Sequence, residues 1–179
     1  NPVLPGILHM DVAGVITEVG EGVTAFKTGD EIYGCAGGLQ GEAGNIEGAL
    51  ADFMLADSNL IALKPKSLSF SESAALPLVT ITAWEGLFDR AHIKKEDHVL
   101  IHGGTGGVGH IAIQLARQHG ARVATTVSSE DKAKVARGLG AEDIIFYRDE
   151  KVEGYTQRLT KGKGFDVVFD TIGSDNLDK

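Results

Sequence analysis

The stretch VLIHGGTGGVGH, from Val99 to His110, constrains the fold of this chain more than any other part of its sequence. Three consecutive apolar residues, Val99 to Ile101, run into five glycines within seven positions. Glycines replace larger residues at the end of a strand when a ligand or another stretch of backbone must approach the main chain closely. The pattern therefore predicts a strand, a tight turn that lies against a partner, and a helix.

From His98 onward, apolar runs of strand length alternate with segments of helical spacing. Predicted strands cover residues 99–101, 121–127, 144–146 and 165–169, and predicted helices cover residues 108–119, 130–139 and 151–159. Gly120 and Gly140 each follow a helix directly, as C-terminal caps do. The apolar run 165–169 is typical of a strand that is covered on both faces. This alternation predicts an α/β fold with a doubly wound parallel sheet.

The first part of the chain consists of short, β-branched, turn-rich segments. Predicted strands cover residues 12–19, 31–33, 49–56 and 60–63, with a glycine-rich loop over residues 34–48. Strands at this spacing suggest a small β-barrel or sandwich. In the next segment Ser69 and Glu72 have the spacing of a capping box, Pro77 interrupts or restarts a helix, and helical spacing continues to about Arg90. We therefore expect three parts, residues 1–65, 66–95 and 96–179.

The glycine-rich turn fits the G-x-G-x-x-G pattern, and it follows a strand and opens a helix inside a unit of roughly 30 residues. Its residues are Gly104, Thr105, Gly106, Gly107, Val108 and Gly109. We expect Gly104 to allow the tight turn, Gly106 to let a pyrophosphate approach the backbone, and Gly109 to let the helix pack closely on the strand. The free N–H groups at the helix N-terminus favour a diphosphate there. The alternative, a purely structural turn, needs one glycine rather than five.

The end of the second predicted strand bears on which dinucleotide is bound. An acidic residue that grips the ribose hydroxyls is usual there in NAD-binding units, but this chain has Ser128 and Ser129. Lys132, one helical turn beyond Ser128, is a natural partner for a 2′-phosphate, so the pattern favours NADP(H). In a rival interpretation Glu130 or Asp131 is the ribose acid. In a third, a serine simply caps the helix and Lys132 is solvated.

Composition limits the other function classes. The 179 residues are 42% hydrophobic and 23% charged, which is ordinary for a globular protein. The net charge of −8 and the lack of a Lys/Arg cluster argue against nucleic acid or an anionic membrane as a partner. A single cysteine, Cys35, excludes an internal disulfide and suits a reducing, cytoplasmic compartment. No apolar run approaches the roughly 20 residues of a membrane helix.

Taken together, these segments resemble the medium-chain dehydrogenase/reductase superfamily, and within it the zinc-independent quinone oxidoreductase (zeta-crystallin-like) branch. The resemblance rests on residues 8–34, 48–57, 76–84 and 164–173 and on the glycine-rich turn, and it covers essentially the whole chain. It implies a partial GroES-like β-barrel domain and a partial Rossmann domain. Members of this family begin well before Pro2 and continue well beyond Gly173, so we expect the chain to be a fragment.

The resemblance also implies individual roles. Thr82 matches a threonine that contacts the cofactor near its nicotinamide end, and the glycine-rich turn matches the pyrophosphate loop. Ser128 and Lys132 match positions that hold the 2′-phosphate in NADPH-dependent members. Tyr147 matches a tyrosine beside the same phosphate, although it is otherwise interpreted as a surface aromatic after a strand. The implied cofactor is NADP(H).

The resemblance argues against zinc. Zinc-dependent members carry Gly-His-Glu where this chain has His9, Met10 and Asp11, so the histidine ligand is replaced by a thioether, which is a poor zinc ligand. We expect His9, one place away, to face elsewhere. The segment 76–79 lacks the zinc cysteine of those members, and Cys35 stands alone. We therefore expect no metal.

The function expected is hydride transfer from NADPH to a quinone or an α,β-unsaturated carbonyl, with a small-molecule substrate as partner and a homo-oligomer left open. Without a Lewis acid, the hydride must go to an already electrophilic carbon. The sequence identifies no catalytic residue, and Asp11 is assigned no role. The alternatives are an enoyl-thioester reductase of the same superfamily, a zinc-dependent alcohol dehydrogenase, and a crystallin-like protein that binds NADPH without turnover.

Overall fold

A computed structural model describes residues 7–38, 40–41, 44–45 and 48–173 of the chain. The chain divides into two compact units, unit 1 (Asn1–Leu78) and unit 2 (Val79–Lys179). The division falls inside helix α2 (Pro77–Trp84), within the connecting segment predicted over residues 66–95. Among the described residues, no helix combines the length and the apolar character that crossing a membrane requires.

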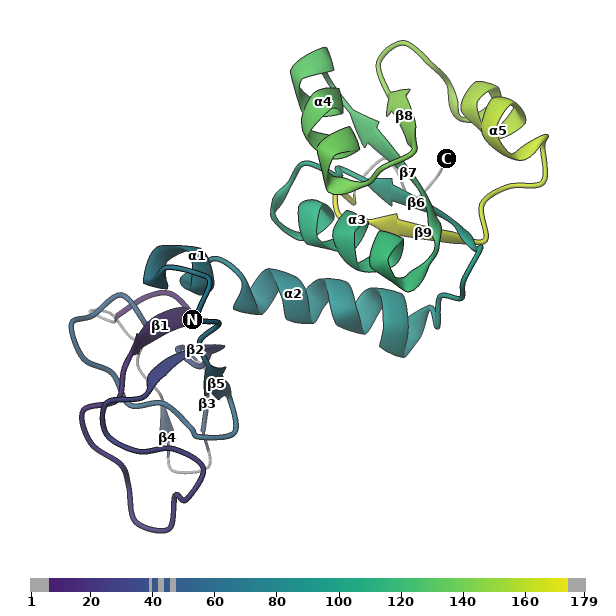
Figure 1. The fold of residues 1–179 in the computed structure, drawn as a ribbon. Helices are drawn as coiled ribbons and strands as arrows, with labels where there is room; N and C mark the ends of the chain where they lie inside the picture. The colour runs from purple at the N-terminus through teal and green to yellow at the C-terminus, as the bar shows by residue number, and fades with distance from the viewer. Residues whose placement is uncertain (1–6, 39, 42–43, 46–47, 174–179) are drawn as a thin grey trace. The chain divides into compact units, whose positions relative to one another are not determined.

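Unit 1 contains a three-stranded antiparallel sheet in the order β1-β2-β5 (Figure 1). Its strands are β1 (Asp11–Val15), β2 (Glu31–Cys35) and β5 (Ile61–Leu63). Asp11 lies opposite Cys35, and Val15 lies opposite Glu31. Two short strands, β3 (Gln40–Gly41) and β4 (Gly44–Asn45), pair in a hairpin of their own inside the segment expected to be a loop. The described strands form an antiparallel sheet, as a GroES-like domain requires, rather than a closed barrel.

Two strand predictions in unit 1 need correction. The strand expected over residues 12–19 ends at Val15. Beyond it, Ile16 still donates to the Asp30 carbonyl at 3.0 Å and accepts from the Gly29 amide at 2.8 Å. The strand expected over residues 49–56 is wrong, because the chain bends there and no described strand pairs with it. Its apolar side chains stay outside, with Leu50, Phe53 and Leu55 exposed by 69, 76 and 89%. An apolar run becomes a strand only where a neighbouring strand accepts its hydrogen bonds.

The connecting helices follow the sequence signals closely. Helix α1 (Phe70–Ala74) begins with the predicted capping box: the Glu72 amide donates to Ser69 Oγ at 3.2 Å, and the Ser69 amide donates to Glu72 Oε2 at 2.9 Å. Helix α2 begins at Pro77, which therefore restarts the helix. The predicted continuation to Arg90 is confirmed, but residues Glu85–Arg90 adopt the wider π-helical turn, which the spacing did not indicate.

Unit 2 is a parallel four-stranded sheet in the order β8-β7-β6-β9, with helices on both faces (Figure 1). The strands are β6 (His98–His102), β7 (Arg122–Val127), β8 (Asp143–Phe146) and β9 (Val167–Asp170). The helices are α3 (Gly107–His119), α4 (Glu130–Leu139) and α5 (Val152–Thr160). Successive strands run outward from β6 to β8, and the chain then returns to place β9 on the other side of β6. This reversal is the switch point of a doubly wound sheet, and it confirms the predicted fold class.

Apolar side chains from the central strands form the core of unit 2. On the α5 face, Tyr155 packs with Leu100, Ala124 and Ile145. Gly120 and Gly140 end their helices with φ values of 98° and 109°, the left-handed conformation expected of such caps. The expectation that β9 is covered on both faces is not met. Val168 pairs in register with Leu100 but is 55% exposed, because β9 lies at the edge of the described sheet beyond the cluster around Tyr155.

At the opposite end of the strands from the glycine-rich turn, His98 begins β6 within a group of charged residues. Its Nε2 lies 3.4 Å from Asp143 Oδ2, and Arg122 binds the same carboxylate oxygen at 2.8 Å. The imidazole also packs against the edge of the Phe165 ring. Burial and the nearby Arg122 guanidinium lower the pKa of His98, and the carboxylates of Asp143 and Asp166 offset this only in part.

This environment predicts a pH-dependent stability. Because the pKa of His98 is lower in the folded chain than in the unfolded one, the unfolded chain binds the extra proton below about pH 6.5. The free energy of unfolding should therefore fall as the pH drops through that value, and it should keep its full value above it. Urea denaturation between about pH 5 and 7.5 measures this slope. His98→Gln should reduce the dependence of the unfolding free energy on pH, whereas His92→Gln, at an exposed position, should leave it unchanged. The same pH dependence in the unchanged protein and in both variants would contradict the prediction.

Candidate functional site

The turn after β6 has little room for side chains. Gly103 has a φ of +71°, so the left-handed position is Gly103 rather than Gly104, where the sequence had placed the tight turn. A Cβ atom on Gly104 would lie 2.0 Å from Thr125 Oγ1, and one on Gly109 would lie 2.2 Å from the Gly103 carbonyl oxygen. Both glycines therefore let helix α3 start directly against the sheet and its own turn, as expected for Gly109.

Gly106 differs from these two glycines because its Cβ position is much less crowded. A Cβ atom there would meet only the Gly103 carbonyl oxygen, at 3.2 Å, and Gly106 is exposed. Gly107, also exposed, would meet Val79 Cγ1 at 3.5 Å. A side chain at position 106 would need only a shift of a few tenths of an ångström in the Gly103 carbonyl, whereas a ligand lying against the main chain would require a glycine there.

The N-terminus of α3 presents unpaired backbone donors at this open surface. Gly106 is the N-cap and provides no side-chain acceptor, and the first turn contains no acidic residue. The amides of Gly107, Val108 and Gly109 have no acceptor among the described residues, whereas the next amide, that of His110, bonds to the Gly106 carbonyl at 3.1 Å. Three N–H groups at the positive end of the helix dipole form a site for an anion such as a diphosphate.

Hydrogen bonds from neighbouring strands hold the turn in place. The Gly103 amide donates to Thr126 Oγ1 at 3.0 Å, and the Thr171 hydroxyl donates to the His102 carbonyl at 2.7 Å. Within the turn, the Gly106 amide donates to the Gly103 carbonyl at 2.9 Å. Thr105 is half-buried between these anchors. The donors at the start of α3 therefore have a fixed orientation before any ligand arrives.

The predicted phosphate-selecting residues lie at the same edge of the sheet. Ser128 follows β7 and Tyr147 follows β8, and the carboxyl ends of parallel strands meet at one edge. Ser129 is the N-cap of α4, and its hydroxyl accepts from the Lys132 amide at 3.4 Å. The capping interpretation is therefore correct for Ser129, while Ser128 is left half-buried beside the turn.

The charges on α4 distinguish the acidic residues from Lys132. Glu130 is bound by Arg137 at 2.8 Å, and Asp131 is bound by Lys134 at 3.4 Å. The Lys132 ammonium has no hydrogen bond or ion pair with any described residue and is exposed. The two acids that could grip a ribose or repel a phosphate each have a basic partner at the surface, and Lys132 is left available for a ligand.

Arg148 is a cation at this edge that the sequence pattern did not indicate. Its guanidinium carbon lies 5.7 Å from the centre of the Tyr147 ring, and it makes no ion pair with a described residue. The signal available in the sequence was its position directly after Tyr147, at the end of a strand. Arg148 and Tyr147 together add a positive group and a hydroxyl to this edge.

Thr82 lies on α2, one turn beyond Val79, the residue whose side chain approaches Gly107. Residues three apart on a helix share a face, so Thr82 lies on the side of α2 that is near the glycine-rich turn. All the residues selected from the sequence for cofactor binding therefore belong to unit 2.

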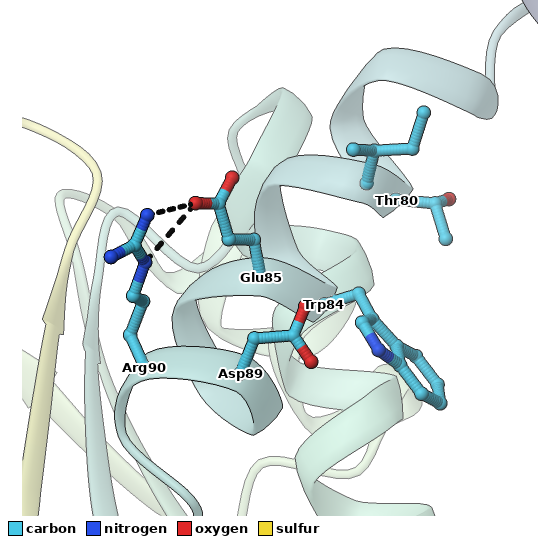
Figure 2. Close-up of a pocket in the computed structure, with 6 residues that line it drawn as sticks. Thr80, Trp84, Glu85, Asp89 and Arg90 are labelled. Atoms are coloured by element: carbon cyan, nitrogen blue, oxygen red, sulfur yellow. Dashed lines mark hydrogen bonds and ion pairs between the residues drawn. The ribbon is translucent and has the colours of Figure 1, made fainter.

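A cavity of about 550 Å³ in unit 2 is separate from these residues (Figure 2). It is lined by Thr80, Ile81, Trp84, Glu85, Asp89 and Arg90. Arg90 donates two hydrogen bonds to Glu85 Oε1, and the Trp84 indole points away from this pair (Figure 2). None of the residues predicted to bind a cofactor lines this cavity, so we do not assign it to the site.

Unit 1 has a cavity of its own, of about 610 Å³, at the start of β1. It is lined by His9, Met10, Asp11, Ala49, Leu50, Ala74 and Leu78. His9 lines this cavity together with Met10, and the direction of its imidazole stays a prediction. His9 has a φ of +72°, which breaks the alternation of side chains in an extended chain and brings three consecutive residues to the same cavity.

Asp11 and Cys35 lie together next to this cavity. Asp11 Oδ1 accepts a hydrogen bond from the Leu78 amide at 2.9 Å, at the start of α2. Burial raises the pKa of the Cys35 thiol, and the Asp11 carboxylate raises it further. Within the described ranges, no group of three or more His, Cys, Asp or Glu side chains is arranged to hold a metal ion.

A doubly wound sheet with a glycine-rich turn at its switch point defines a nucleotide-binding α/β unit. A family model described as the alcohol dehydrogenase GroES-like domain matches residues 1–66, and one described as zinc-binding dehydrogenase matches residues 107–179. The chain belongs to the medium-chain dehydrogenase/reductase superfamily, as its resemblance predicted.

Individual relatives agree with this assignment. The chain is 40% identical over 171 residues to the 2-methylene-furan-3-one reductase of Solanum lycopersicum, an alignment that covers 95% of this chain and 42% of the relative. It is 46% identical to an alcohol dehydrogenase superfamily protein from Novosphingobium aromaticivorans (TM-score 0.90; 98% of this chain, 51% of that one). It is 32% identical to the Escherichia coli quinone oxidoreductase complexed with NADPH (TM-score 0.87; 99% and 52%). The chain thus spans about half the length of these proteins.

The close packing at Gly104 gives a stability prediction. Gly104→Ala should lower the free energy of unfolding by about 1–3 kcal/mol, because the new methyl group would clash with Thr125. The φ of Gly104 is not in the left-handed region, so backbone strain does not contribute to this loss. Gly138→Ala is the matched control: it lies in α4 with no atom within 4 Å of its Cβ position, and it should stabilise by about 0.5–1 kcal/mol. Urea denaturation measures both changes, and a Gly104→Ala protein as stable as the unchanged protein would contradict the packing argument.

Proposed function

We propose that the protein is an NADPH-dependent reductase that transfers hydride to a quinone or an α,β-unsaturated carbonyl without zinc. The observation that carries this proposal is the carboxyl edge of the sheet in unit 2, where α3 begins with three unpaired amides after β6 and α4 carries an unpaired Lys132 after β7. A diphosphate and a further phosphate are the two anionic parts of NADP(H). The NADPH complex of the Escherichia coli quinone oxidoreductase, whose fold this chain shares, supports the same conclusion.

The glycine-rich turn would hold the diphosphate. The amides of Gly107, Val108 and Gly109 would donate to its oxygens, and the bare surface at Gly106 leaves room for it. Thr82, on the face of α2 near this turn, would contact the cofactor closer to its nicotinamide end. None of these residues carries a negative charge, so nothing in the turn opposes an anion.

Selection of NADP(H) over NAD(H) would come from the ends of β7 and β8. Ser128 and Tyr147 offer hydroxyl groups, and Lys132 and Arg148 offer cations that form no ion pair with a described residue. Ammonium and guanidinium groups form strong, charge-assisted hydrogen bonds to phosphate. The basic partners of Glu130 and Asp131 make a ribose-gripping role for either acid the weaker interpretation.

Bound NADPH supplies a hydride, and the chain determines which acceptor is suitable. Met10 offers a thioether, and residues 76–79 contain no cysteine, so the donors that zinc prefers are missing from the positions where zinc-dependent members have them. The matched family model has zinc in its name, but this chain lacks the zinc-binding side chains at the corresponding positions. Without a Lewis acid, the acceptor must itself be electrophilic, which favours quinones and enones.

The phosphate-selecting role can be measured by calorimetry on the full-length protein. Lys132→Ala and Arg148→Ala should each weaken NADPH binding by roughly 10-fold or more, since a hydrogen bond to a charged group contributes about 1.5–3 kcal/mol, and NADH binding should hardly change. Lys163→Ala is the control, because this exposed lysine precedes β9, at the end of the sheet opposite the glycine-rich turn. Tighter binding of NADH than of NADPH by the unchanged protein would contradict the selectivity, and binding of neither would contradict the cofactor site.

Turnover tests the reaction itself. We expect the full-length protein to oxidise NADPH with 9,10-phenanthrenequinone at a rate that a strong zinc chelator does not reduce. Stoichiometric zinc together with loss of rate on chelation would favour the zinc-dependent alcohol dehydrogenase alternative. Tight NADPH binding without oxidation by quinones or enones would favour the crystallin-like alternative.

A further inference from the structure

We propose that Thr126 and Thr171 are positioning residues for cofactor binding: together they fix the peptide unit between His102 and Gly103, and through it the amides that receive the diphosphate. The proposal rests on the cofactor site proposed above, and all of its residues belong to unit 2. It concerns the diphosphate, which NADPH and NADH share, and not the choice between the two dinucleotides.

The two hydroxyl groups bind opposite ends of one peptide unit. The His102 carbonyl and the Gly103 amide lie in the same plane, because a peptide bond does not rotate freely. Thr171 donates to this carbonyl at 2.7 Å, and this amide donates to Thr126 Oγ1 at 3.0 Å. Thr126 lies on β7 and Thr171 directly follows β9, the two strands that flank β6. The plane is therefore held from both sides of the strand, at the switch point of the sheet.

Both threonines are themselves held in place. Thr126 is 5% exposed and lies opposite Ile145 in the register of β7 with β8. The segment that carries Thr171 is anchored by Asp170, whose Oδ1 accepts from the amides of Ile172 and Gly173 at 2.8 and 3.1 Å. The hydroxyl groups thus reach the peptide unit from rigid supports.

The covalent chain alone does not fix the orientation of this peptide unit. Rotation of the plane changes the φ of the residue that follows it, and glycine adopts positive and negative φ about equally readily. Gly103 nevertheless has a φ of +71°, and its carbonyl accepts from the Gly106 amide at 2.9 Å, directly before α3 begins. The hydroxyl groups of Thr126 and Thr171 therefore select one orientation of a unit that could otherwise rotate.

A fixed orientation raises the affinity for an anion. When only a fraction of the molecules holds the binding conformation, the apparent affinity for the ligand falls by that fraction. The unpaired amides of Gly107, Val108 and Gly109 follow this turn and would donate to the diphosphate. Lys132 and Arg148 follow other strands, β7 and β8. Loss of either threonine hydroxyl should therefore weaken NADPH and NADH binding by the same factor, whereas Lys132→Ala should act on NADPH alone.

Valine and serine substitutions test this role by calorimetry on the full-length protein. Thr126→Val and Thr171→Val each remove a hydroxyl group at nearly constant shape. We expect each to weaken NADPH and NADH binding by roughly 5- to 10-fold, with the ratio of the two affinities unchanged. Thr126→Ser and Thr171→Ser keep the hydroxyl group and should keep most of the affinity.

Thr160 provides a matched control at the other end of the sheet. Its hydroxyl accepts from the amide of Gly164 at 2.9 Å, and Gly164 is also left-handed, with a φ of +86°. Thr160→Val should lower the midpoint of urea denaturation, as the other two valine variants do, but leave both dinucleotide affinities unchanged. An equal loss of affinity in Thr160→Val would show a general effect of lost stability and overturn the positioning role.

Hydrogen exchange of the unchanged full-length protein, followed by NMR, does not depend on how the variants fold. Without cofactor, the Gly103 amide should exchange slowly and the amides of Gly107 and Val108 rapidly, and NADPH should slow the latter two. Rapid exchange at Gly103, unchanged affinity in both threonine-to-valine variants, or loss of NADPH affinity alone would overturn this inference while the cofactor site stands. Binding of neither dinucleotide by the unchanged protein would overturn the cofactor site and this inference together.

Discussion

The tight contact between helix α3 and the turn that precedes it is the constraint on which the site in unit 2 depends. With no Cβ atom at Gly104 or Gly109, the helix begins against Thr125 and the Gly103 carbonyl. The first amides of the helix therefore come directly after the end of β6, at the switch point of the sheet. Larger residues at these two positions would move the helix away from the strand and turn its free N–H groups out of the position in which an anion meets them.

Charge pairing on α4 determines which side chains remain for a ligand. The start of this helix carries two acids and one base, so its composition alone does not predict an anionic ligand. Because Arg137 and Lys134 engage Glu130 and Asp131, the groups left without a partner among the described residues are positive. A chain with a net charge of −8 can thus still present an unpaired cation at this edge of the sheet.

The elements of unit 2 could be predicted from sequence because each is specified locally. Apolar runs, helical spacing and two glycine caps fix its strands and helices to within a few residues. The failed strand over residues 49–56 shows the limit of this reasoning, since a strand needs a partner whose position the local pattern does not contain. The same limit applies to the site: the glycine-rich turn is contiguous in sequence, whereas the cavity at His9 depends on Ala49, Ala74 and Leu78 coming together. The unpaired state of Arg148 likewise becomes visible only once the neighbouring side chains are placed.

The π-helical turn from Glu85 to Arg90 contains one residue more per turn than an α-helix would. It places Gly86 where even a methyl group would lie 2.3 Å from the Phe169 ring of β9. A single-residue deletion there would restore ordinary helical pairing, but it would also rotate every later side chain of the segment by about 100°. The length of this segment is therefore fixed by two things at once: the packing of Gly86 against Phe169 and the direction of every side chain that follows.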